Sequence, residues 1–94
     1  MTKPARFKEI CDSICELYQR KNADYGDAFG KSFDEYGIVA ALIRMGDKMN
    51  RIKQLTSSGQ QHVNDESVKD TLLDLASYSI MTVIELDERK LLKQ

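Results

Sequence analysis

The sequence lacks the features that would place it in a membrane or on nucleic acid. None of its apolar runs approaches the ~20 residues that a transmembrane helix needs, and its first residues, MTKPARFKE, contain no apolar signal core. Fourteen basic and fifteen acidic residues give a net charge of −1, without the basic excess typical of a general nucleic-acid binder. We therefore expect a soluble, cytoplasmic protein that binds neither a membrane nor nucleic acid in general.

Cysteine and histidine are also scarce, which argues against a zinc site. Cys11 and Cys15 are four residues apart in a helical pattern rather than in a C-x-x-C pair, and the one histidine, His62, lies in a polar segment. We expect the two cysteines to be small hydrophobic residues on the inner side of a helix, without a disulfide, and His62 to be a surface residue.

The length of the chain limits the size of its core. Ninety-four residues make one small domain, residues 1–94, which buries only roughly 60–70% of the surface that its unfolded form exposes. Because such a core is thin, we expect it to be completed by homo-oligomerisation, as a dimer or a tetramer.

Apolar residues recur every three or four positions in three segments, and no segment alternates for long with the period of two that indicates a strand. The fold class is therefore all-α, a small antiparallel helical bundle. The predicted helices span about residues 4–21, 33–55, and 64 or 65 to 89–92, and the last two are joined by a short connection.

The segment NADYGDAFGKSFDEYG, residues 22–37, has no periodic apolar pattern and holds three of the five glycines. We expect it to be a long ordered loop. Ser32 and Glu35 have the spacing of a capping box, which places the start of the second helix near Phe33. The stretch GDAFGKS is not a phosphate-binding P-loop, because Tyr25 stands where that motif needs its first glycine.

Helical projection at 100° per residue gives the second helix two faces. One is a narrow basic row of Arg44, Lys48 and Arg51, with Asp47 among them. The other, which we expect to face the core, is an apolar stripe: Ile38, Leu42, Met45, Met49 and Ile52.

The third helix carries an acidic row, with Glu66 at its margin: Asp70, Asp74, Tyr78, Met81 and Glu85. Its opposite side is apolar and is expected to pack on the core: Val68, Leu72, Leu75, Ala76, Val83 and Leu86. Two interpretations of the acidic row stay open. It is either a solvated or salt-bridged surface, or a functional site, since Tyr78 and Met81 are poor choices for a fully wet face.

The functional interpretation is a metal–nucleotide site. Asp70 and Asp74 lie one turn apart, and Asp47 from the neighbouring helix could complete a set of oxygen ligands for Mg²⁺, an ion often held by one or two carboxylates plus substrate phosphates. The basic row would then bind the phosphates. The metal would polarise the phosphoryl group and generate the attacking hydroxide, with Glu66 as a further ligand or a group that orients water.

Four residues after the first helix could close over this site and contact the base or sugar: Lys21, Asn22, Asp24 and Tyr25. In that arrangement Tyr25 or Phe29 would stack on a nucleobase. The alternative is that Tyr25, Phe29 and Phe33 pack the loop onto the bundle.

Three stretches of the chain, KNADYGDAF, RMGDKMNRIKQL and ESVKDTLLDLASYSIM, together resemble the phage and bacterial family called nucleotide modification associated domain, type 1. The resemblance covers roughly residues 15–86. That family is similar in turn to the all-α nucleoside triphosphate pyrophosphatases, the MazG and dimeric dUTPase-like group. Those enzymes cleave a nucleoside triphosphate to the monophosphate and pyrophosphate with Mg²⁺ held by E-x-x-E on one helix and E-x-x-D on the next.

The family motifs match this sequence at some positions and not at others. Asp74 matches the closing aspartate of the second motif, and Asp47 takes the second acidic position of the first. Arg44 replaces the first acid of that motif, and Thr71 stands where the second motif has its glutamate, one position after Asp70.

The resemblance implies an α-helical Mg²⁺–nucleotide site in phage deoxynucleotide metabolism or modification. In this hypothesis Asp47, Asp70 and Asp74 are metal ligands and Glu66 is catalytic. Nucleoside triphosphate binds six residues: Lys21, Asn22, Tyr25, Arg44, Lys48 and Arg51. The alternatives are a non-catalytic module that binds a nucleotide or a protein, and a helical assembly unit whose acidic and basic rows pair with each other.

Overall fold

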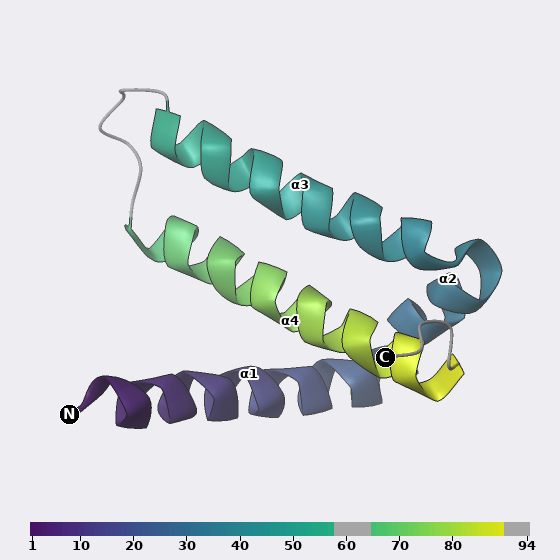
Figure 1. The fold of residues 1–94 in the computed structure, drawn as a ribbon, viewed down its shortest axis with the longest axis horizontal. Helices are drawn as coiled ribbons and strands as arrows, with labels where there is room; N and C mark the ends of the chain where they lie inside the picture. Colours follow the sequence, from purple (N-terminus) through teal and green to yellow (C-terminus); the bar gives the residue numbers. More distant parts are fainter. Residues whose placement is uncertain (58–64, 90–94) are drawn as a thin grey trace.

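The computed structural model describes residues 1–57 and 65–89, and the regular secondary structure in these ranges is helical throughout. The prediction of an all-α fold is confirmed. Four helices follow one another: α1 (Lys3–Tyr25), α2 (Ala28–Tyr36), α3 (Ile38–Ser57) and α4 (Asp65–Arg89). Helices α3 and α4 pack as an antiparallel hairpin, and α1 runs along α4 on the side away from α3 (Figure 1). Within these ranges no helix could cross a membrane.

The segment expected to be a long loop is mostly helical, so that prediction was wrong. Helix α1 continues to Tyr25 and ends at Gly26, whose φ of 60° is left-handed. Asp27 then caps α2, because its Oδ1 accepts a hydrogen bond from the Gly30 amide at 3.2 Å. The capping box expected at Ser32 is not formed, since Ser32 lies inside α2. A nine-residue helix that contains a glycine is too short for its periodicity to stand out.

The expected start of the second helix near Phe33 falls in the middle of α2. Two helices replace the one predicted there, and Gly37 separates them with a φ of 71° and a ψ of −157°. Glycine adopts this conformation at little cost, whereas residues with a Cβ rarely do. The turn at Gly37 lets α2 fold across the end of the hairpin, so that Phe33 is 1% exposed.

Small and polar residues make up the interior of the hairpin. Ala41 of α3 is fully buried, and Thr71, Thr82 and Glu85 of α4 are buried as well. The Thr71 hydroxyl donates to the carbonyl of Ser67, and the Thr82 hydroxyl to that of Tyr78, each at 2.7 Å. These bonds replace the hydrogen bonds to water that the hydroxyl groups lose on burial, which is why threonine can occupy the inner side of α4.

Several large apolar residues expected to face the core lie at the surface, so the predicted inner faces were partly wrong. Leu42 and Met49 of α3 are 55% and 42% exposed, and Leu72 and Val83 of α4 are 47% and 55% exposed. Helical periodicity identifies an apolar face but not which neighbour covers it. In α4 the apolar positions extend round more of the helix than α1 and α3 can cover.

The two cysteines differ from expectation in their exposure only. Cys11 and Cys15 are free thiols, as predicted, but both are exposed rather than turned toward the core. His62, which was expected at the surface, and Asn64, one of the two expected first residues of the last helix, lie outside the described residues.

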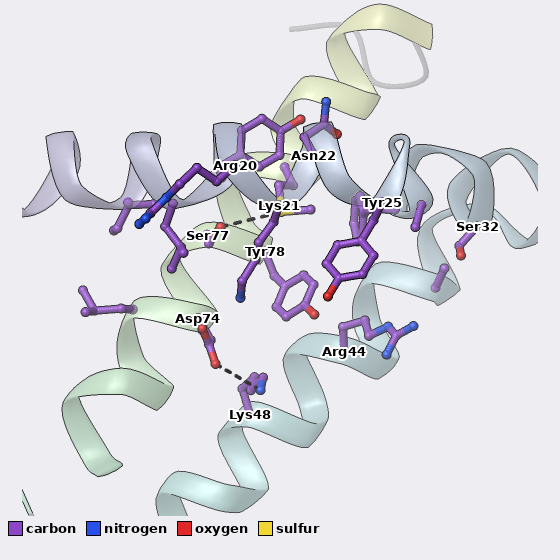
Figure 2. A pocket seen from close by; sticks show the side chains of 18 of the residues that line it. Arg20, Lys21, Asn22, Tyr25, Ser32, Arg44, Lys48, Asp74, Ser77 and Tyr78 are labelled. Atoms are coloured by element: carbon purple, nitrogen blue, oxygen red, sulfur yellow. Dashed lines mark hydrogen bonds and ion pairs between the residues drawn. The ribbon is translucent and has the colours of Figure 1, made fainter. Parts of the chain in front are cut away.

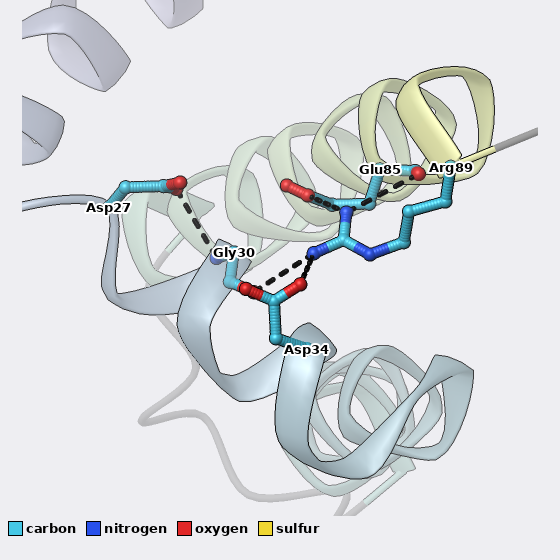
Figure 3. A network of polar contacts seen from close by, with 5 residues as sticks. All are labelled: Asp27, Gly30, Asp34, Glu85 and Arg89. Atoms are coloured by element: carbon cyan, nitrogen blue, oxygen red, sulfur yellow. Dashed lines mark hydrogen bonds and ion pairs between the residues drawn. The ribbon is translucent and has the colours of Figure 1, made fainter.

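A polar network fixes the end of α4 to α2 (Figure 3). Arg89 donates to Glu85 Oε2 at 2.6 Å and to the Gly30 carbonyl at 3.3 Å, and it forms an ion pair with Asp34. Its guanidinium carbon lies 4.9 Å from the centre of the Phe33 ring. The hydrogen bonds to Asp34 and Glu85 raise the pKa of Arg89, so the cation that balances buried Glu85 stays charged.

Candidate functional site

A cleft of about 780 Å³ lies where α1, the start of α2 and the α3–α4 hairpin meet. This volume falls in the range of small-molecule sites, roughly 300–1,000 Å³. The extension of α1 to Tyr25 brings Lys21, Asn22 and Tyr25 onto the cleft as part of a helix rather than a loop. The hairpin supplies Arg44 and Lys48 from α3 on the opposite side. The residues of α4 that line the cleft are Leu73, Asp74, Ser77, Tyr78 and Met81.

Among the described residues, four cations and one carboxylate line this cleft. Arg20 and Lys21 come from α1, Arg44 and Lys48 from α3, and Asp74 from α4. Figure 2 shows the Lys21 side chain extending from α1 toward the α4 side of the cleft, where Asp74 and Tyr78 lie. The lining therefore carries a formal charge of +3, which favours an anionic ligand.

Asp74 and Lys48 form an ion pair across the hairpin, with Lys48 Nζ 3.2 Å from Asp74 Oδ2 (Figure 2). The Lys48 side chain is 29% exposed and the Asp74 side chain 38%, so solvent screens the pair and its contribution to stability is about 1 kcal/mol or less. An anion that enters the cleft can compete for Lys48 at small cost. Of the two interpretations of the acidic row, the salt-bridged surface describes Asp74 in the free chain.

Aromatic rings occupy the end of the cleft near α2. Phe29 packs against Tyr78 with the ring centres 5.9 Å apart, and against Phe33 at 6.3 Å. Tyr25 is 71% exposed and Figure 2 shows its ring over the cleft on the same side as Tyr78. Phe29 thus packs α2 onto the bundle, whereas Tyr25 leaves a ring face free for stacking.

Tyr18 adds a hydroxyl to the wall that α1 provides. Burial raises the pKa of this phenol above its ordinary value of 10.0, and the negative charges of Asp27, Glu85 and Glu88 raise it further. At neutral pH the group is therefore a protonated hydrogen-bond donor, which suits an anionic ligand.

The structure gathers some of the predicted site residues and leaves others apart. Those at the cleft are Lys21, Asn22, Tyr25, Arg44, Lys48 and Asp74. Four others are exposed and do not line it: Asp47, Arg51, Glu66 and Asp70.

The three aspartates expected to hold Mg²⁺ are not brought together. Within residues 1–57 and 65–89, no three histidine, cysteine, aspartate or glutamate side chains gather as a metal site would require. A resident Mg²⁺ cage does not fit this arrangement. The single carboxylate of Asp74 fits an ion that the phosphates of a ligand would largely coordinate themselves.

Arg20 and Tyr18 are cleft residues that the sequence interpretation did not assign. The signal for Tyr18 lies in the period of α1: Ile14, Tyr18, Lys21 and Tyr25 recur at three- and four-residue intervals and so share one face. Arg20 does not belong to this series, and the periodic pattern gives no signal for it. Ending the helix at Lys21 concealed this continuity.

Residues 21–86 match the family described as nucleotide modification associated domain 1. The matched range begins at Lys21 and includes α2, α3 and most of α4, and thus most of the cleft. Searches of curated proteins and of solved structures gave no match.

Proposed function

The chain belongs to the nucleotide modification associated domain 1 family, and from this membership and the geometry of the cleft we propose that it binds a nucleoside triphosphate there. The phosphates contact Arg44 and Lys48 on one wall and Arg20 and Lys21 on the other. The base stacks on Tyr25.

The observation that carries this proposal is the composition of one cleft: four cations, one carboxylate and an exposed tyrosine ring. Arginine forms forked contacts with phosphate oxygens, and lysine provides a compact point charge. Aromatic stacking contributes to affinity for any base, because every base has a π-face. A cleft that only sealed two helices together would not need an excess of three positive charges.

Magnesium enters this proposal as part of the nucleotide. A triphosphate carries Mg²⁺ on its own oxygens. Of the carboxylates in the described ranges, Asp74 is the one that lines the cleft and could add a protein ligand or accept a hydrogen bond from a metal-bound water. On binding, Lys48 would leave Asp74 and pair with the phosphates instead. The charge of Lys48 would then be balanced by the phosphates, and the Asp74 carboxylate would be free to contact the metal or a metal-bound water.

Cleavage of the triphosphate to monophosphate and pyrophosphate is the second candidate function. It is supported by the match of Asp74 to the closing aspartate of the pyrophosphatase motif and by the position of this carboxylate in the cleft. Water would attack the α-phosphorus, the bond to the bridging oxygen would break, and Asp74 would accept the proton from the water. Non-catalytic binding of a nucleotide needs only the cations and Tyr25.

Isothermal titration of the full chain with unmodified and base-modified deoxynucleoside triphosphates tests the binding proposal. We expect Arg44→Ala and Lys48→Ala each to weaken binding by about tenfold or more, since a hydrogen bond to a charged group contributes roughly 1.5–3 kcal/mol. Arg51→Ala is the matched control, because it removes a cation from the same helix outside the cleft and should leave affinity within about twofold. Equal losses in Arg44→Ala and Arg51→Ala would place the ligand elsewhere.

Release of pyrophosphate in the presence of Mg²⁺ separates the enzyme from the binding module. Turnover that disappears in Asp74→Asn, while binding persists, supports cleavage. Binding without turnover across the panel leaves the non-catalytic function. If no nucleotide binds with or without Mg²⁺, the chain is an assembly or protein-binding unit instead.

A further inference from the structure

One face of the α3–α4 hairpin, on the side away from the cleft, is apolar and has no partner among the described residues. It consists of seven residues, here called the back face: Leu42, Gly46, Met49, Leu72, Ala76, Ser79 and Val83. The larger of them are 42–55% exposed. In the described part of the chain the buried hydrophobic residues are Phe33 and Ala41 alone. Covering the back face would therefore add substantially to the apolar surface that the protein removes from water.

The register of the hairpin arranges the back face in three layers. The Lys48–Asp74 ion pair and the contact of 3.6 Å between Ser79 Oγ and Met45 Sδ set α3 against α4. Antiparallel pairing in this register puts Leu42 level with Val83 and Met49 level with Leu72. Between these two bulky layers lie the small ones: Gly46, Ala76 and Ser79. The back face therefore has large side chains at both ends and small ones in the middle, which leaves a shallow depression at its centre.

Gly46 marks the centre of this face, and no contact with a described residue explains why position 46 is a glycine. It lies in the middle of α3, where glycine costs about 1 kcal/mol relative to alanine. A Cβ at this position would meet nothing within 4 Å in the described part of the chain, so the space around position 46 would also accommodate a larger side chain. Exposed Leu42 and Met49 lie one turn to either side of Gly46. Because glycine has no Cβ, another helix could approach α3 closely at this point.

Charges at the two ends of the back face identify the partner. Lys69 and Asp87 are exposed and lie on one line of α4, because 18 residues make five turns and span about 27 Å. Neither forms an ion pair within residues 1–57 and 65–89. Their midpoint lies between Ala76 and Ser79, level with Gly46. One end of the face is thus basic and the other acidic, around a small centre.

We propose that the back face binds the back face of a second copy of this chain, with the two hairpins antiparallel across a two-fold axis at Gly46. This orientation places Lys69 of each copy beside Asp87 of the other. It also sets the bulky layer of Leu42 and Val83 against that of Met49 and Leu72, and the small centres against each other. The product is a four-helix core with both clefts facing outward.

The size of the back face agrees with a stable dimer. Two helices packed about 10 Å apart present a width of roughly 20 Å, and with a length of about 27 Å the footprint is on the order of 500 Å². The accessible area over ridged side chains exceeds this flat footprint. It therefore approaches the ~800 Å² per partner that specific interfaces bury.

Sedimentation equilibrium of the full chain across the micromolar range tests this interface. The wild type is expected to be a dimer, and Gly46→Leu to raise its dissociation constant by about tenfold or more, because leucine prevents the central close approach. The variant should keep its helical circular dichroism, since the site is open in the single chain and leucine is the better helix former. Gln54→Leu adds the same side chain to the same helix about 80° away and should not change the mass.

Charge reversal tests the orientation independently of Gly46. Lys69→Glu and Asp87→Lys should each weaken the dimer, and the double variant should restore it, because opposite charges then face each other again. A monomeric wild type would overturn the proposal. So would a dimer that tolerates Gly46→Leu, or single charge reversals that the double variant does not rescue.

Discussion

Among single residues, Gly30 shows how local geometry reverses a general propensity. Glycine inside a helix usually costs about 1 kcal/mol relative to alanine. At Gly30, however, a Cβ would lie 2.8 Å from Asp27 Cγ, and real Cβ atoms do not approach other atoms so closely. Asp27 cannot move away freely, because its carboxylate caps α2. The glycine is therefore required by the cap three residues before it.

We predict that Gly30→Ala destabilises the chain by about 1–2 kcal/mol, the usual value of an N-cap, instead of stabilising it. In a background of Asp27→Gly the same change should stabilise by up to about 1 kcal/mol, since the clashing carboxylate is gone and glycine suits the φ of 58°. Urea denaturation of the four variants measures the coupling. Additive effects of the two substitutions would mean that the cap does not determine the residue at position 30.

At the level of helices, α1 is held less firmly than the hairpin. None of its residues is buried, and its contacts are made chiefly with α4, through one face that includes half-buried Ile14 and Tyr18. Segments with few buried contacts open locally at lower free energy than the global unfolding. One wall of the cleft is therefore the helix best able to move away from the others.

We predict that amides in the middle of α1 exchange with solvent at least about tenfold faster than those of α4 at the level of Thr71–Thr82. Hydrogen exchange read by mass spectrometry measures this directly. A nucleoside triphosphate that bridges Arg20 and Lys21 to Arg44 should slow exchange in α1 and leave exchange in the centre of α4 little changed. Equal protection of α1 and α4 in the free chain would show that α1 is an integral part of the core.

The periodic pattern correctly predicted that three segments are helical. It failed for a helix too short to show a full repeat, and for apolar residues whose burial depends on which helix packs against them. Helix α2 was missed because nine residues around Gly30 show no full apolar repeat. The orientation of Leu42 and Leu72 was wrong because a pattern does not specify what lies opposite it. For the site, Arg44, Lys48 and Lys21 could be proposed from residue type and resemblance, whereas the Lys48–Asp74 pair depends on the register of the hairpin.

For the molecule as a whole, the cleft and the back face divide the hairpin between two tasks. Residues on one side of α3 and α4, such as Lys48 and Asp74, line the cleft, and those on the other, such as Met49 and Leu72, form the proposed dimer. Substitutions on one side should leave the other unaffected, because no residue belongs to both. Loss of the dimer and loss of nucleotide binding can therefore be measured separately.

Because its buried hydrophobic residues are so few, the chain should depend on its partner for stability. Unfolding of a dimer is coupled to its dissociation, so we predict that the melting temperature rises by about 3–5 °C for each tenfold increase in protein concentration. Gly46→Leu should melt at a lower temperature than the wild type at the same concentration, because its dimer is weaker, whereas Gln54→Leu should melt as the wild type does. Differential scanning calorimetry over a hundredfold range of concentration provides the measurement. A wild-type melting temperature that does not change with concentration would mean that the thin core around Phe33 and Ala41 is sufficient by itself.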